Sequence, residues 1–121
     1  MNQISNKTYK SNLDDRTLEF AKRIVHLSRA LPRDTVNLEL KKQLIRSGAS
    51  VGANYREAND ALSKKDFVYR LRINRKEAKE TQYWLNLIIE ANLEFQKRIE
   101  PLLQESIELI KILSSIIEKS K

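Results

Sequence analysis

Residues that break helices are almost absent from this chain, whose 121 residues include only 2 glycines and 2 prolines. Glycine and proline are the two residues that fit a helix interior least well, so long uninterrupted helices are possible along most of the sequence. Apolar residues recur at three- and four-residue steps, the period of one helix face, as in Phe20, Ile24, Leu27 and Leu31. No stretch shows the two-residue alternation of a strand. The sequence therefore predicts an all-α fold.

A few capping and helix-breaking residues mark the helix ends. Pro32 ends the first helix, because the residue before a proline is pushed out of the α region, and Asp34 or Thr35 caps the second. Ser63 begins a weak capping box for the third helix, and we expect Asn92 to end it in a left-handed conformation. We predict a loose tail over residues 1–13 and one domain over residues 14–121, with helices at about 14–31, 35–62, 64–91 and 95–119.

Four helices with short connections predict an antiparallel up-down four-helix bundle. The apolar surface is wider than one bundle needs, since isoleucine and leucine cover more than half the circumference of helix 95–119. On helix 64–91, Ile73, Trp84, Leu87 and Ala91 lie beside the core face rather than on it. Exposed apolar patches usually mark interfaces, so we expect a homo-oligomer. The alternative is a monomer whose flanking positions are simply rich in leucine and isoleucine.

Composition argues against most kinds of catalysis. The chain has no cysteine and a single histidine, His26, too few for a thiolate or multi-histidine metal site or for a Ser-His-Asp triad. Glu77 and Glu80 have half the spacing of a di-iron carboxylate motif, but the histidines of that motif are missing. We therefore predict no catalytic residues, no metal, no cofactor and no enzymatic activity.

We expect no membrane-spanning segment. The most apolar run, residues 85–89, contains Asn86 and is much shorter than the roughly 20 residues that a spanning helix needs. The polar N-terminal dozen residues have no apolar signal core. A cytoplasmic protein with no membrane partner is the expected class.

Both glycines lie in one unusual stretch, residues 46–54. A phosphate-binding loop would need a Gly-Lys-Ser/Thr end after a strand, and neither is present. Gly48 and Gly52 are four residues apart, and small residues at that spacing let a neighbouring helix approach closely. We interpret the stretch as a helix face for close packing.

Polar residues accompany the glycines on two facing helices. One face of helix 35–62 contains Arg46, Ser50, Asn54 and Glu57. One face of helix 64–91 contains Glu77, Glu80, Thr81 and Trp84. If these helices form a hairpin that turns near residues 62 and 63, Arg46 lies level with Glu80. We interpret this set as a structural network that fixes the register of the helices, with a catalytic site as the alternative. The structural motif comprises Arg46, Ser47, Ser50, Asn54, Glu57, Glu77, Glu80, Thr81 and Trp84.

Positive charge is concentrated in the third predicted helix. The chain has a net charge of +7, and residues 64–79 hold seven basic side chains against two acidic ones. Basic groups release counterions from phosphates, and tyrosines stack on unpaired bases. We hypothesise that this surface binds RNA or DNA; the alternatives are a solvated helix face and a face for an unknown acidic protein. The candidate residues are Lys65, Tyr69, Arg72, Lys76, Lys79 and Tyr83, which form one stripe (the basic stripe), together with Arg75.

Three ordered blocks of the chain resemble a known family. They are residues 43–58 (QLIRSGASVGANYREA), 61–67 (ALSKKDF) and 76–85 (KEAKETQYWL), preceded by Leu31-Pro32. These blocks are similar to the four helix bundle proteins, also called 23S rRNA intervening-sequence proteins. Gly48, Tyr55 and Arg56 depart from the residues usual in the family.

The resemblance implies an antiparallel four-helix bundle that assembles as a homopentameric ring, with no enzymatic activity and no established biochemical role. A distant relative, the accessory protein of diversity-generating retroelements, is a basic pentamer that binds nucleic acid and a reverse transcriptase. That relation supports the nucleic-acid hypothesis only by analogy. The family motif falls on Arg46, Ser47, Ser50, Asn54, Glu57, Asp66, Phe67, Lys76, Glu77, Glu80, Thr81 and Trp84.

Overall fold

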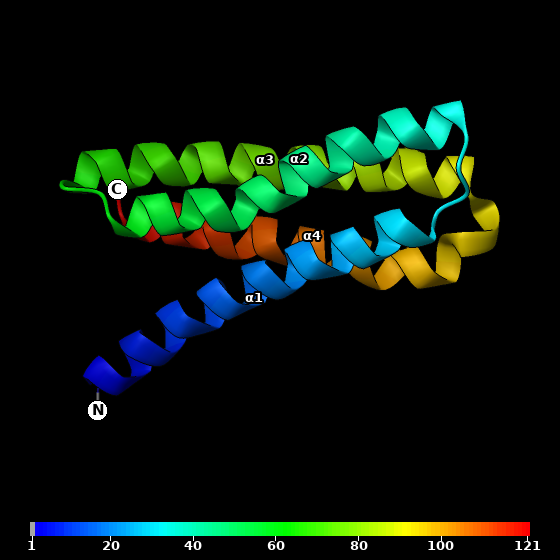
Figure 1. Ribbon diagram of the computed structural model, residues 1–121. Helices are drawn as coiled ribbons and strands as arrows, with labels where there is room; N and C mark the ends of the chain where they lie inside the picture. The colour runs from blue at the N-terminus through cyan, green and yellow to red at the C-terminus, as the bar shows by residue number, and fades with distance from the viewer. Residues whose placement is uncertain (1) are drawn as a thin grey trace.

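The computed structural model describes residues 2–121, with side chains from Asn12 onward. Consecutive helices run antiparallel to one another (Figure 1). The described residues contain no strand, so the predicted all-α fold with four helices is confirmed. The helices are α1 (Asn2–Ala30), α2 (Thr35–Asn59), α3 (Lys64–Ala91) and α4 (Gln96–Lys119), with a short 3-10 turn, η1 (Leu93–Phe95), before α4.

Two of the predicted helix starts are confirmed by their capping hydrogen bonds. The Asp34 carboxylate accepts a hydrogen bond from the Asn37 backbone N–H at 2.8 Å, and the Ser63 hydroxyl accepts one from the Asp66 N–H at 3.0 Å. The tail predicted over residues 1–13 falls mainly outside the residues whose side chains are described, and the α1 backbone begins at Asn2.

The prediction for Asn92 is wrong, because its φ of −142° is not left-handed. Its side chain is instead buried in a reciprocal amide pair with Asn37. Asn37 Nδ2 donates to Asn92 Oδ1 at 2.9 Å, and Asn92 Nδ2 donates to Asn37 Oδ1 at 2.8 Å. Asn92 Nδ2 also donates to the Ile88 carbonyl at 2.9 Å. The pair thus joins the beginning of α2 to the end of α3 and satisfies both buried amides.

The core is a column of apolar side chains to which every helix contributes. α2 packs against both α1 and α3, and α3 packs against α4, whereas α1 meets α4 less extensively. α1 diverges from the other helices toward its N-terminus (Figure 1). Core side chains that are at most 1% exposed include Phe20, Ile24, Leu44, Val51, Leu71, Ala78, Leu85, Leu109 and Leu113.

One ion pair links α1 directly to α4. Arg16 Nε donates to Glu105 Oε2 at 2.7 Å, and Arg16 Nη2 donates to Glu105 Oε1 at 2.9 Å. This two-point geometry is the strong form of an arginine–carboxylate contact. The hydrogen bond to Glu105 raises the pKa of Arg16, which burial opposes. Arg16 therefore strengthens the contact between α1 and α4, which is less extensive than the contacts between the other neighbouring helices.

The predicted close packing at the two glycines is confirmed, and the neighbouring helix is α1. A Cβ on Gly48 would overlap Ile24 Cδ1, and a Cβ on Gly52 would lie 3.1 Å from Thr17 Oγ1. Farther along, Arg56 Nη2 donates to the Asp14 carbonyl at 3.4 Å. We call the contact of Gly48 and Gly52 with α1 the glycine seam; a larger side chain at either glycine would require Ile24 or Thr17 to move.

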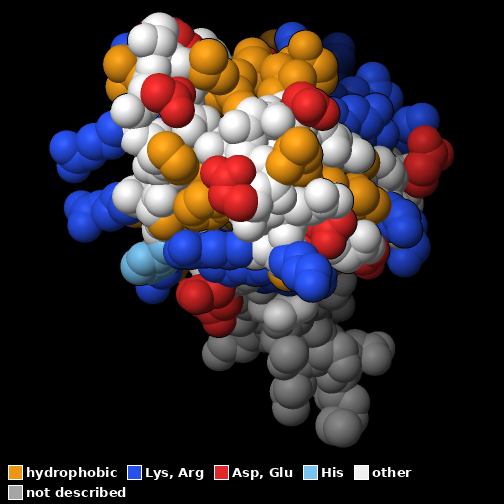
Figure 2. Space-filling view, turned by 90° about the vertical axis from the view of Figure 1, so that its right-hand side faces the viewer, with side chains coloured by type: hydrophobic (Ala, Val, Ile, Leu, Met, Phe, Trp, Pro, Cys, Tyr) orange, Lys and Arg blue, Asp and Glu red, His pale blue; other side chains and the backbone are white. Residues whose placement is uncertain are grey.

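Some apolar side chains remain exposed. Val36, Leu38 and Leu93 are 58%, 46% and 60% exposed, and they belong to the end of the bundle where the α1–α2 and α3–α4 connections lie. Figure 2 views that end and shows hydrophobic side chains gathered there among charged ones. The broad apolar face of α4 is better covered than the sequence suggests, because flanking residues such as Ile112 are partly buried against the core. Among the described residues, no helix is long and apolar enough to cross a membrane.

Gly48→Leu should lower the free energy of unfolding by about 1–3 kcal/mol or more, because the new side chain must displace Ile24 in a packed seam. Ala49→Leu is the matched control, since Ala49 is the next residue of α2 and is exposed. Urea denaturation followed by circular dichroism measures both. Equal stability of the two variants would show that α1 does not pack at Gly48.

Candidate nucleic-acid interface

α3 presents its core residues and the basic stripe on opposite sides. The buried residues of α3 include Leu71, Ala78 and Leu85, which point into the bundle. The six residues of the basic stripe are all exposed, with Tyr69 at 63% and Tyr83 at 58%. The helical period thus brings the six side chains onto one solvent-facing surface, while their role in binding stays a prediction.

The cations of the basic stripe carry charge that the fold does not neutralise. Among the described residues, Lys65, Arg72, Lys76 and Lys79 take part in no ion pair. Arg70, which lies off the stripe, differs: its Nε is 3.1 Å from Asp66 Oδ2, and its Nη1 is 3.7 Å from a Glu57 oxygen. Unpaired cations on a shared face attract phosphates without first breaking an internal ion pair.

Arg75 faces α4 rather than the centre of the stripe. Its Nη1 donates to Ser114 Oγ at 3.4 Å. Nearby on α4, a hydrogen bond from Lys121 lowers the pKa of Glu118, and the charges of Lys121, Arg75 and Arg72 lower it further. α4 therefore brings one carboxylate toward the part of the stripe that contains Arg72.

The two tyrosines of the stripe have different surroundings. The ring of Tyr83 meets the ring of Trp84 edge to face, with centroids 5.1 Å apart and planes at 74°. Trp84 is itself partly buried against the core. Tyr69 lies instead beside a hollow between the beginning of α3 and the end of α4, which has a volume of 620 Å³. The sequence does not reveal this hollow, because α4 completes it. Its lining is Lys64, Lys65, Val68, Tyr69, Arg72, Ser120 and Lys121.

The predicted contact between Arg46 and Glu80 is present. Arg46 Nη2 donates to Glu80 Oε2, and Arg46 Nη1 donates to Glu77 Oε1 at 3.4 Å. The hydrogen bond to Glu80 raises the pKa of Arg46, which is already charged at neutral pH. Because the Arg46 side chain is 47% exposed, solvent screens this pair, and its contribution to stability is small.

A second polar contact lies directly beneath that ion pair. Thr81 Oγ1 donates to Ser47 Oγ at 2.9 Å, and Ser47 Oγ lies 3.4 Å from the Leu44 carbonyl, to which it donates. Ser47 and Thr81 are both fully buried. They form a buried polar contact between α2 and α3, and the sequence alone does not predict this pairing.

The other motif residues do not join this network. Ser50 donates to the Arg46 carbonyl of its own helix at 2.7 Å, Asn54 is half-buried, and Glu57 faces Arg70. The predicted structural motif is therefore several separate contacts rather than one continuous network.

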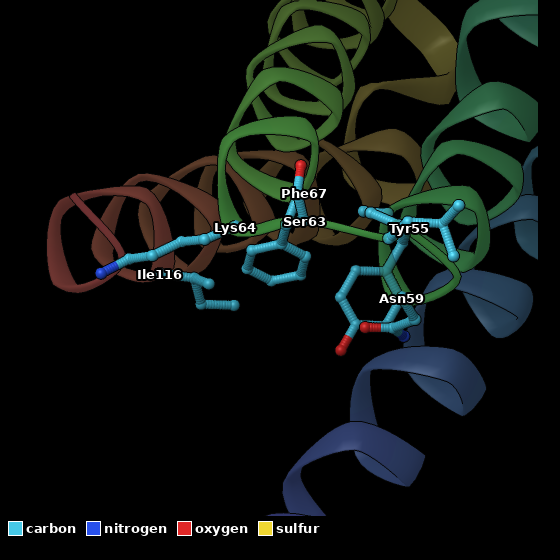
Figure 3. A pocket seen from close by; sticks show the side chains of 9 residues that line it. Tyr55, Asn59, Ser63, Lys64, Phe67 and Ile116 are labelled. Atoms are coloured by element: carbon cyan, nitrogen blue, oxygen red, sulfur yellow. The ribbon is translucent and has the colours of Figure 1, made fainter.

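A further hollow of 520 Å³ lies beside the α2–α3 turn. Figure 3 shows Phe67 of α3 between Ile116 of α4 and the Tyr55 and Asn59 side chains of α2. The lining of this hollow contains no aspartate, glutamate, histidine or cysteine. Within the described part of the chain, no three His, Cys, Asp or Glu side chains gather closely enough to hold a metal ion.

Comparisons with known proteins give a family match and a similar solved structure. A family model described as 23S rRNA-intervening sequence protein matches residues 10–115. The chain is also similar to a protein of unknown function from the S23 ribosomal protein family of Bacteroides thetaiotaomicron. The two are 44% identical, with a TM-score of 0.79 over 87% of this chain and 97% of that one. No protein of curated function matches significantly.

Arg46→Ala and Thr81→Ala should differ in both size and salt dependence. Arg46→Ala should lower the free energy of unfolding by about 1 kcal/mol or less, and the loss should shrink at high salt. Thr81→Ala should cost about 1–3 kcal/mol at any salt concentration, because it removes a buried hydrogen bond and buried volume. Urea titrations at low and high salt measure both losses, and a larger loss for Arg46→Ala would reverse this ranking.

Proposed function

Because the chain belongs to the 23S rRNA-intervening sequence protein family, we propose that it is a non-enzymatic, self-assembling four-helix bundle that binds nucleic acid through the basic stripe of α3. The unpaired state of the four stripe cations is the observation that carries this proposal. Surface cations in proteins are often matched by nearby carboxylates, as Arg70 is here. A row of cations without ion-pair partners on a single face is a surface that can bind phosphate groups.

We include self-assembly, as a homopentameric ring, in the proposal. Its support is the exposure of large apolar side chains such as Val36, Leu38 and Ile73, which a partner copy would cover. Assembly would also repeat the basic stripe around the ring, so that a weak contact on each copy becomes strong by avidity. The cytoplasmic location expected from the sequence stays a prediction.

The combined variant Arg72→Ala, Lys76→Ala and Lys79→Ala should weaken binding to a labelled RNA at least tenfold. It should also reduce the slope of log affinity against log salt by about 2–3, because each lost phosphate contact removes about one unit. Fluorescence anisotropy measures affinity and slope, and light scattering in the same buffer should give a mass near five times the 14.2 kDa protomer.

The matched control removes the same charge elsewhere, at Lys42, Lys97 and Lys111, which are exposed on α2 and α4. If both triple variants lose affinity equally, net charge rather than the stripe causes binding. If the unaltered protein binds neither RNA nor DNA, the proposal fails, and a protein partner for this face becomes the leading alternative.

A further inference from the structure

We propose that the hollow between the beginning of α3 and the end of α4 holds one unstacked nucleotide of a single-stranded nucleic acid. This inference rests on the proposed function and adds to it the kind of strand that binds. The hollow has a volume of 620 Å³, within the range of about 300–1,000 Å³ that small-molecule sites in proteins occupy.

The lining of the hollow has the two chemistries that a nucleotide requires. Tyr69 and Val68 supply an aromatic ring and an aliphatic wall, against which the flat face of a base can pack. Lys64, Lys65 and Arg72 surround them with positive charge. Base and phosphate would therefore each meet a complementary surface within one hollow.

The lining side chains of the hollow include four cations and no carboxylate, although Glu118 lies close to one of them. Lys121 Nζ lies 3.0 Å from Glu118 Oε1, so this lysine is already paired. Among the described residues, Lys64, Lys65 and Arg72 have no ion-pair partner. Three cations thus stay available to an anionic group that enters beside Tyr69.

The position of Tyr69 favours a single strand over a duplex. A base reaches a tyrosine ring only when it has left its own stack, and a duplex must break pairing and stacking to release one. The ring of Tyr69 is 63% exposed and lines the hollow, whereas the ring of Tyr83 already contacts Trp84. The remaining stripe cations, such as Lys76 and Lys79, would hold the phosphates of the adjoining strand without reading its sequence.

Anisotropy titrations with a labelled, unstructured RNA strand, and with the same strand annealed to its complement, test this inference. The unaltered protein should bind the single strand more tightly at equal salt. Tyr69→Ala should weaken single-strand binding about tenfold more than duplex binding, the size expected for one stacked base. Tyr69→Phe should restore the affinity, since a phenyl ring stacks as well as a phenol. Gln104→Ala, at an exposed and uncharged residue of α4, is the surface control.

The outcomes separate this inference from the proposed function. Salt-dependent binding with equal affinity for both forms, or a Tyr69→Ala loss equal on both, would overturn the nucleotide site and leave the basic stripe as a general phosphate surface. Failure of Tyr69→Phe to restore affinity would overturn the stacking role. No salt-dependent binding to either form would overturn both the site and the proposed function.

Discussion

The short turn between α2 and α3 fixes the level at which the residues of these two helices face one another, and the rest of the structure follows from that register. It brings Arg46 to Glu80 on the surface and Ser47 to Thr81 in the interior. The apolar residues of α3, such as Leu71, Ala78 and Leu85, bury one face of that helix in the core. Because a helix has only one opposite face, the basic stripe must then lie in solvent. The exposure of the stripe is thus a consequence of how α3 is packed.

A turn of equal length, residues 31–34, joins α1 to α2, and two further contacts position α1. The glycine seam holds α1 close to α2, because Gly48 and Gly52 have no side chains and Ile24 and Thr17 occupy the space beside them. The two-point ion pair between Arg16 and Glu105 then ties it to α4. The seam limits how far α1 can shift along α2, and a shift would misplace the core residues of the whole bundle.

Much of this arrangement could be predicted from the sequence, where the determinants are local. Capping residues mark the helix starts, the helical period places the stripe opposite the core, and the hairpin turn predicts the Arg46–Glu80 contact. The pair of Asn37 and Asn92 is not predicted, because the sequence suggests a left-handed backbone at Asn92, whereas its side chain links the two helices instead. The Arg16–Glu105 contact and the hollow beside Tyr69 could not be predicted, because both depend on how α4 lies against helices distant from it in sequence.

The central claim is that nucleic acid contacts the solvent face of α3, and not every positively charged part of the protein surface. Lysine-reactivity footprinting with mass spectrometry, with and without a single-stranded RNA, tests it most directly. Lys65, Lys76 and Lys79 should be protected by the RNA, whereas Lys42 and Lys111, which are 61% and 69% exposed, should react as before. Equal protection of all five lysines, or protection confined to Lys42 and Lys111, would contradict the account.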